Sequence, residues 1–200
     1  MDEAAVPWEG WLALGTEVEQ LRRGDLNALG AILARYQNRL YRYLLRLVRE
    51  PAAAEDLFQQ TWLRVAQNIR QYDARRNFEA WLFRVARNLA IDHLRRHRHE
   101  SLDEPLPSGA TPGEQLRAAE PGALQALVAG ERTRRVAQAL ERLPVIHREV
   151  LTLRFEEEMK LEEIAAVLET PLSTVKSRLR RALDALRDRL LAQLPEQEWQ

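Results

Sequence analysis

Apolar residues recur every three to four positions along most of this chain, and no segment shows the polar–apolar alternation that is typical of a strand. The pattern predicts an all-α protein. In the first half it predicts a helix from its capping residue Asp25 to about Val48, a second that begins at Pro51, and a third after a loop over residues 71–77. The residues expected to be buried in these helices are Leu26, Leu29, Leu33, Tyr36, Leu40, Tyr43 and Leu47; Phe58, Trp62, Val65 and Ile69; and Phe78, Leu82, Val85 and Leu89.

A pair of short helices is predicted between Leu161 and Arg181. Pro171 ends the first of them because it lacks a backbone donor, Ser173 is expected to cap the second, and Glu169 stands where many such turns carry glycine. The apolar face of the second helix holds Val175, Leu179, Ala182 and Leu186, and its other side holds Ser173, Lys176, Ser177, Arg180, Arg181 and Asp184. A basic, hydrogen-bonding helix after a short turn fits the major groove of DNA. An amphipathic hairpin with a solvated polar face is the alternative.

Proline and glycine divide the chain into two halves. The segment 101–122 contains four prolines and three glycines, which no regular helix tolerates, and it carries an excess of acidic residues. We therefore predict two small helical domains joined by a flexible acidic linker. The expected divisions are an N-terminal arm over 1–24, a first domain over 25–100, the linker over 101–122, a second domain over 123–194 and a tail over 195–200.

The two predicted domains each present a further polar face. Opposite its buried side, the third helix carries a basic stripe formed by Arg84, Arg87, Asn88, Ile91, Arg95 and Arg98. Such a stripe suits phosphate neutralisation, and a solvated helix end explains it equally well. The second helix turns Leu63 outward among Asp56, Gln59, Gln60 and Gln67, which indicates a protein contact, although one outward leucine is ordinary on a surface.

Composition narrows the function classes. The 200 residues carry 30 basic and 30 acidic side chains, so net charge does not point to nucleic acid, and the absence of cysteine excludes disulfides and thiolate metal sites. No apolar run reaches the length of a membrane span, and Met1-Asp2-Glu3 lacks the basic start of a secretory signal, so a cytoplasmic protein is expected. His93 and His97 are four residues apart on a predicted helix with His99 nearby, which leaves an enzyme or metal protein as an alternative, but no carboxylate–histidine pattern of catalytic spacing accompanies them. We expect no cofactor, metal, small-molecule substrate or catalysis.

Two blocks in each half resemble a known family. Residues 54–63 and 78–96 resemble the second conserved region of bacterial sigma factors of the small extracytoplasmic-function (ECF) group. Residues 143–154 and the core Thr174-Val-Lys-Ser-Arg178 resemble the fourth region of the same family. The resemblance covers about residues 25–190 and implies an alternative sigma factor that binds core RNA polymerase and recognises and melts promoters. It also implies that the linker threads the nucleic-acid channel of the polymerase.

The resemblance also implies roles for individual residues. Asp56, Gln59, Gln60 and Leu63 match the surface that binds the clamp helices of the polymerase, and the flap is a second expected contact. Residues implied at the minus-10 element are Tyr72, Asp73, Asn77, Arg84, Arg87, Asn88, Asp92 and Arg95. Residues implied at the minus-35 element are Ser173, Thr174, Lys176, Ser177, Arg178, Arg180 and Arg181. The family further implies an anti-sigma factor as a partner.

Another class of protein remains open. A one-component or response-type transcriptional regulator also carries a C-terminal helix-turn-helix unit. Such a regulator explains the second half of this chain only, and it predicts self-association and binding to palindromic DNA without polymerase.

Overall fold

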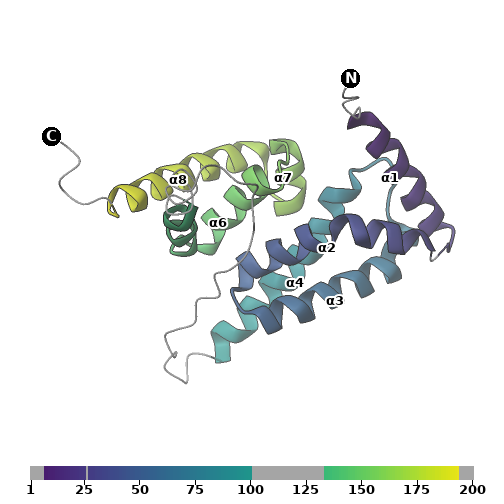
Figure 1. The fold of residues 1–200 in the computed structure, drawn as a ribbon, viewed down its shortest axis with the longest axis horizontal. Helices are drawn as coiled ribbons and strands as arrows, with labels where there is room; N and C mark the ends of the chain where they lie inside the picture. Colours follow the sequence, from purple (N-terminus) through teal and green to yellow (C-terminus); the bar gives the residue numbers. More distant parts are fainter. Residues whose placement is uncertain (1–6, 26, 101–132, 194–200) are drawn as a thin grey trace, which may run out of the picture.

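The computed structural model describes residues 7–25, 27–100 and 133–193, and every regular element in these ranges is a helix (Figure 1). The all-α prediction is therefore confirmed. The N-terminal helices are α1 (Pro7–Arg22), α2 (Asn27–Val48), α3 (Pro51–Asn68) and α4 (Phe78–Glu100), with a 3₁₀ turn over Ile69–Gln71. The C-terminal helices are a segment over 133–141, α6 (Val145–Leu151), a π-helical turn over Thr152–Glu156, α7 (Leu161–Leu168) and α8 (Leu172–Leu191).

The N-terminal helices begin where the sequence predicts. The Asp25 carboxylate accepts a hydrogen bond from the backbone N–H of Asn27 at 3.0 Å, and Pro51 is the first residue of α3 after an extended Glu50. Helix α1 packs on α2 and contributes Val18 and Leu21 to the core. The arm expected over residues 1–24 is thus largely a packed helix in its described part.

The predicted buried stripes are partly correct. Along α2, Tyr36, Leu40, Tyr43 and Leu47 are buried as expected. Leu29 and Leu33 are only partly buried, and Ile32 and Leu44 are fully buried instead. The apolar stripe is wider than a single row because α2 is covered by α1, α3 and α4 together. Phe58 and Val85 are likewise at the core margin, and Leu26 lies outside the described residues.

The predicted break between the last two helices is confirmed, but the predicted cap is wrong. Helix α7 ends at Leu168, and Glu169 adopts the left-handed conformation with φ 52° that glycine usually supplies. Pro171, with φ −57° and ψ 146°, is the residue before α8. Ser173 therefore lies inside the first turn rather than at the capping position, because extended backbone is already fixed two residues earlier by the proline ring.

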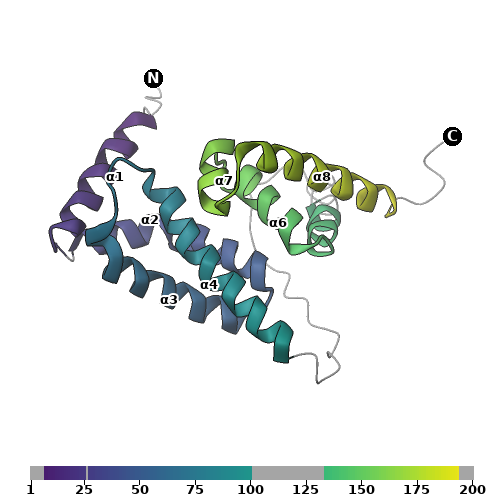
Figure 2. The same cartoon turned by 180° about the vertical axis from the view of Figure 1, so that it is seen from behind.

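The C-terminal helices lie against one face of the N-terminal helices (Figures 1 and 2). Helix α7 packs against α4, and α6 packs against both α2 and α8. The predicted linker over 101–122 and the tail over 195–200 lie outside the described residues. The two groups of helices therefore meet through α2 and α4 on one side and α6, α7 and the π-helical turn on the other.

Candidate nucleic-acid interface

Helix α8 presents the basic face that the sequence predicts. Val175 and Ala182 are fully buried against the C-terminal core, while Leu179 and Leu186 are partly buried. The other side of the helix is exposed at Ser173, Lys176, Arg180 and Arg181, and half-buried at Thr174, Ser177 and Arg178. This face has the length and the side chains to enter a DNA major groove.

For Arg178, beside the apolar face of α8, the sequence predicts a pair with Glu162 or Glu163 or a contact with phosphate. In the described part of the chain it forms no ion pair with either glutamate. Glu163 instead accepts a hydrogen bond from its own helix start, the backbone N–H of Lys160, at 2.7 Å. The charge of Arg178 acts on Glu149, where it helps to offset the effect of burial on that carboxylate.

The outward surface of α3 also agrees with the sequence pattern. Asp56, Gln59, Gln60 and Leu63 are all exposed. Leu63 is the most exposed large apolar side chain among the described residues, at 61%. The opposite face of α3 carries Leu57, Trp62 and Val65 into the core. An apolar side chain is thus held in solvent on a rigid helix between polar neighbours, which suits a protein contact.

The loop before α4 forms one wall of a cavity of about 300 Å³. Tyr72 is buried, and its ring lies 5.0 Å from that of Trp81 and 5.7 Å from that of Phe78, between ring centroids. The residues that line the cavity are Arg64, Asn68, Gln71, Tyr72, Trp81, Val85 and Asn88. The cavity therefore combines aromatic surface with amide groups and one arginine, which are the groups that bind a nucleobase.

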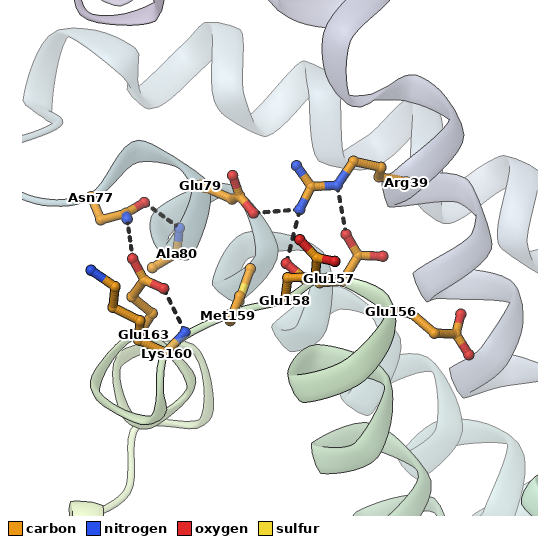
Figure 3. Close-up of a pocket in the computed structure, with 10 residues that line it drawn as sticks. All are labelled: Arg39, Asn77, Glu79, Ala80, Glu156, Glu157, Glu158, Met159, Lys160 and Glu163. Carbon is orange, nitrogen blue, oxygen red and sulfur yellow. Dashed lines mark hydrogen bonds and ion pairs between the residues drawn. The ribbon is translucent and has the colours of Figure 1, made fainter. Parts of the chain in front are cut away.

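Asp73 and Asn77 shape this loop. The Asp73 carboxylate accepts a hydrogen bond from the backbone N–H of Arg75 at 3.0 Å. Asn77 caps α4, because its side-chain oxygen accepts from the backbone N–H of Ala80 at 3.0 Å. Its side-chain nitrogen donates to Glu163 at 2.7 Å, so the starts of α4 and α7 are joined by their own capping side chains (Figure 3).

The basic stripe of α4 is covered over part of its length. Arg87 donates to the Glu149 carboxylate on α6 at 2.8 Å, and the hydroxyl of Tyr43 donates to the same oxygen at 3.3 Å. Arg84 lies 3.7 Å from Glu169. Farther along the helix, Arg95 is exposed and pairs with its neighbour Asp92 at 3.1 Å. Asn88 and Ile91 are half-buried between these two parts.

A second polar cluster joins α2 to the π-helical turn, as shown in Figure 3. Arg39 donates through Nε to the Glu157 carboxylate at 2.8 Å and through a terminal nitrogen to the backbone carbonyl of Glu157 at 3.2 Å. The same guanidinium binds Glu79 of α4 and lies over the rings of Tyr36 and Phe83. This arrangement uses the planar fork of arginine on two carboxylates at once.

Burial governs the ionisation of these groups. Desolvation raises the pKa of Glu149, and Arg87 and Tyr43 oppose that rise. Desolvation also raises the pKa of Glu157, and Arg39 opposes it. On α6, burial with help from Arg49 and Arg46 lowers the pKa of Arg148 to about 10. Charged groups are thus held at low solvent exposure where the two groups of helices meet.

Other kinds of site find no support in the described ranges. No helix there combines the length and apolar character of a membrane span. No three acidic or histidine side chains there come together to hold a metal ion. The rings of His93 and His97 do approach each other, with centroids 4.2 Å apart.

Sequence reasoning missed three residues that join the two groups of helices, Arg39, Glu149 and Glu157, and it named Tyr43 only as a core residue. A signal for two of them exists in the sequence. Arg39 lies between Tyr36 and Tyr43 on the buried side of its helix. Glu149 directly precedes the buried Val150. A charged residue at a core position signals a partner elsewhere, but the sequence does not say which.

Comparison with known proteins matches the N-terminal helices and the C-terminal helices to two separate family regions. Residues 32–100 match the family model for Sigma-70 region 2, and residues 139–188 match that for Sigma-70 region 4. The chain is 32% identical over 176 residues to the ECF RNA polymerase sigma factor SigW of Bacillus subtilis, covering 86% of this chain and 94% of that protein. It is 36% identical over 149 residues to SigL of Mycobacterium tuberculosis, covering 74% and 80%.

Solved structures agree with this fold. CnrH, in complex with the cytosolic domain of CnrY, has a TM-score of 0.67 and 25% identity, covering 91% of this chain and 99% of that one. The sigma factor RpoE of Bartonella quintana, in complex with the anti-sigma factor NepR, has a TM-score of 0.66 and 24% identity, covering 83% and 98%. With region 2 and region 4 both matched, in order, and SigW aligned over nearly its whole length, this chain belongs to the ECF RNA polymerase sigma factors.

Proposed function

We propose that this alternative sigma factor recognises its promoters at two points, through α8 in region 4 and through the start of α4 with its preceding loop in region 2. The observation that carries the proposal is the presence of a separate polar face on each matched region: an exposed basic face on α8, and an aromatic and amide-lined cavity beside the basic stripe of α4. Two separate anchors divide the binding free energy between duplex and opened DNA.

In region 4, the minus-35 element is assigned to α8. The contacting residues are Ser173, Thr174, Lys176, Ser177, Arg178, Arg180 and Arg181. Arg180 and Arg181 are exposed next to each other and suit guanine edges or phosphates, while Ser173 and Lys176 lie nearer the start of the helix and suit phosphate.

In region 2, the minus-10 element is assigned to the loop before α4 and to α4 itself. The contacting residues are Tyr72, Asp73, Asn77, Arg84, Arg87, Asn88, Asp92 and Arg95. A base that leaves the duplex needs a pocket that offsets lost stacking, and the cavity lined by Tyr72, Trp81 and Asn88 supplies aromatic surface and an amide. Arg95, exposed at 71%, is placed to bind the phosphates of the opened strand.

The exposed face of α3 is assigned to core RNA polymerase, where it binds the clamp helices. This face is formed by Asp56, Gln59, Gln60 and Leu63. Region 4 contacts the flap. The division into an arm over 1–24, domains over 25–100 and 123–194, an acidic linker over 101–122 that threads the polymerase, and a tail over 195–200 belongs to this proposal. An anti-sigma factor is the expected regulator, as the complex of RpoE with NepR suggests.

The chain itself performs no covalent chemistry in this scheme, and the polymerase carries the catalytic centre. It acts in the cytoplasm, where polymerase and promoter DNA are found. A helix-turn-helix regulator without polymerase would use only the C-terminal half, whereas the region 2 match gives the N-terminal half a role as well.

Run-off transcription with purified core polymerase tests the proposal. A pool of promoter fragments from the source genome should yield discrete transcripts only when the chain is present. The absence of any chain-dependent transcript, together with tight binding of the free chain to palindromic DNA, would favour the regulator instead.

A further inference from the structure

The ion pairs between the N-terminal helices and the C-terminal helices in the described part of the chain all have the same polarity. Four ion pairs join the two groups in the described part of the chain, and in each one the arginine belongs to α2 or α4 and the glutamate to the C-terminal half. The pairs are Arg39 with Glu157, Arg46 with Glu156, Arg84 with Glu169, and Arg87 with Glu149. Region 4 thus presents carboxylates to a basic face of region 2.

Two of these pairs dominate the contact. The Glu157 side chain is 1% exposed and that of Glu149 is 2% exposed, and each lies 2.8 Å from its arginine. Removing one partner from such a buried pair is costly because the other charge is left uncompensated. The pairs of Arg46 and Arg84 are longer and more exposed, so they contribute little.

The carboxylates cover groups that the proposed function assigns to minus-10 DNA. Arg87 binds Glu149, Arg84 lies beside Glu169, and Asn77 donates to Glu163. A carboxylate and a phosphate compete for the same donors, so an arginine held against a buried carboxylate is less available to DNA. By contrast, Lys176 and Arg181 on α8 stay exposed in the same structure.

We propose that Glu149 and Glu163 take the place of promoter DNA on Arg87 and Asn77, and that the pair of Glu157 with Arg39 helps to hold the free chain in this closed form. This inference rests on the proposed function, because it takes Asn77, Arg84 and Arg87 as minus-10 contacts. The closed form covers the part of the minus-10 face formed by Asn77, Arg84 and Arg87, and it leaves the minus-35 helix accessible to duplex DNA. Opened DNA and the C-terminal helices therefore exclude each other on region 2, and polymerase shifts the population toward the open form only if it binds that form better.

Intramolecular energy transfer tests the closed form. The chain has no cysteine, so Ala66→Cys on α3 and Arg187→Cys on α8, both exposed, accept a dye pair without competing sites. The double variant Glu149→Gln with Glu157→Gln should lower the transfer efficiency. The control is Glu158→Gln with Glu162→Gln, which removes the same charge from exposed positions of the same segment and should leave the efficiency unchanged. Equal transfer in both double variants would overturn the proposal.

Binding to a fluorescent single-stranded DNA of mixed sequence tests the exclusion. The Glu149→Gln with Glu157→Gln variant should bind it about tenfold more tightly than the wild type, because the fraction of binding-competent chain rises. Its affinity for mixed-sequence duplex should stay within about twofold, since α8 is already accessible. An unchanged affinity for single strands, or the same gain in the control, contradicts the exclusion.

A variant in region 2 tests the same contact without altering region 4, and so controls for misfolding of region 4. Arg39→Gln breaks the pair with Glu157 without altering the C-terminal half or any residue assigned to DNA. It should open the chain and tighten single-strand binding in the same direction, with a helical circular dichroism spectrum that matches the wild type. A closed Arg39→Gln chain would count against the proposal.

The run-off assay separates the two hypotheses. Chain-dependent transcripts together with unchanged energy transfer in the glutamate variants leave the sigma function intact and remove the closed form. Conversely, a lack of transcripts rejects the promoter function, while the energy-transfer result still decides whether the carboxylates hold the two groups of helices together.

Discussion

At the scale of single residues, Glu169 shows how a local backbone state constrains a turn. Its φ of 52° closes α7 in the left-handed region, where a side chain with a Cβ is disfavoured, and its carboxylate sits at the negative end of the helix. Glu169 lies 3.7 Å from Arg84, but its side chain is 54% exposed. This ion pair therefore offsets little of the cost of the left-handed backbone and of the negative charge at the helix end.

We therefore expect Glu169→Gly to raise the free energy of unfolding by about 0.5 to 1 kcal/mol. Urea unfolding followed by circular dichroism measures the change. Thr170→Gly is the matched control, because the next residue does not have a positive φ, and glycine there should destabilise the chain. Destabilisation by Glu169→Gly would show that the Arg84 contact outweighs the backbone strain.

Glu149 offers a residue-scale test of the buried contact through pH. Burial raises its pKa above 4.5 in the folded chain, so the folded chain holds a proton more tightly than the unfolded chain does. The contribution of Glu149 to the free energy of unfolding therefore increases as the pH falls from above the raised pKa toward 4.5. At pH values above the raised pKa this contribution is smallest.

Glu149→Gln should remove this part of the pH dependence. Urea midpoints measured between about pH 7 and the ordinary glutamate value should vary less steeply with pH in the variant than in the wild type. Glu158→Gln, at an exposed position, should leave the slope as it is. Identical slopes in all three chains would show that Glu149 does not titrate in this range.

At the scale of elements, α4 lines the cavity with one side and packs into the core with the other. Asn88 lines the cavity that also contains Tyr72, and Leu82, Phe83 and Ala86 on the other side of the helix are buried in the core. Because Asn88 lines the cavity and is only half-buried, its amide is expected to matter for DNA more than for folding.

Asn88→Ala in the holoenzyme should impair promoter opening more than closed-complex binding. Permanganate reactivity of unpaired thymines reports opening, and gel mobility of the complex reports binding. Asn38→Ala, at an exposed position of α2 outside the cavity and outside the residues assigned to promoter DNA, is the matched control. Equal losses at the two steps for Asn88→Ala would show that the amide acts before the duplex opens.

Helix α8 is the second element with a testable face. Arg181 is exposed on the polar side of the helix, and a base contact there is worth about 1 to 3 kcal/mol of discrimination. Arg181→Ala should flatten the preference of the holoenzyme among minus-35 variants by about that amount, measured as competition between templates. Arg187→Ala, also exposed on the same helix but outside the assigned set, should keep the preference.

At the scale of the whole molecule, the exposed leucine of α3 is the proposed contact with core polymerase. Leu63 is 61% exposed, so its replacement does not open a cavity in the core. We expect Leu63→Asp to weaken binding to core polymerase by about tenfold or more if the side chain is buried in the complex, since desolvating a new charge is costly.

Fluorescence anisotropy of labelled chain against core polymerase measures this loss. Gln37→Glu, which adds one negative charge at an exposed position of α2 outside this face, is the control and should bind nearly as the wild type does. The melting temperature of Leu63→Asp should not change. Normal polymerase affinity for Leu63→Asp would remove this face from the interface.

The sequence by itself determined the helices and their order. Apolar spacing and the positions of Pro51 and Pro171 set helix boundaries within a few residues, because these signals act locally. The basic faces of α4 and α8 were visible for the same reason, since a period of 3.6 residues fixes which side chains share a face. The family motifs added the assignment to two regions, which the comparisons confirm.

Only the tertiary structure decided what lies opposite each face. The polar side of α4 was expected to meet solvent or DNA, yet Arg87 meets Glu149, and Arg39 meets Glu157 from 118 residues away. Periodicity cannot predict this, because a charged residue reads as polar whether it faces water or a buried partner of opposite charge. Over the ranges that the structure describes, the folded chain shows which arginines are held by its own glutamates and which stay exposed.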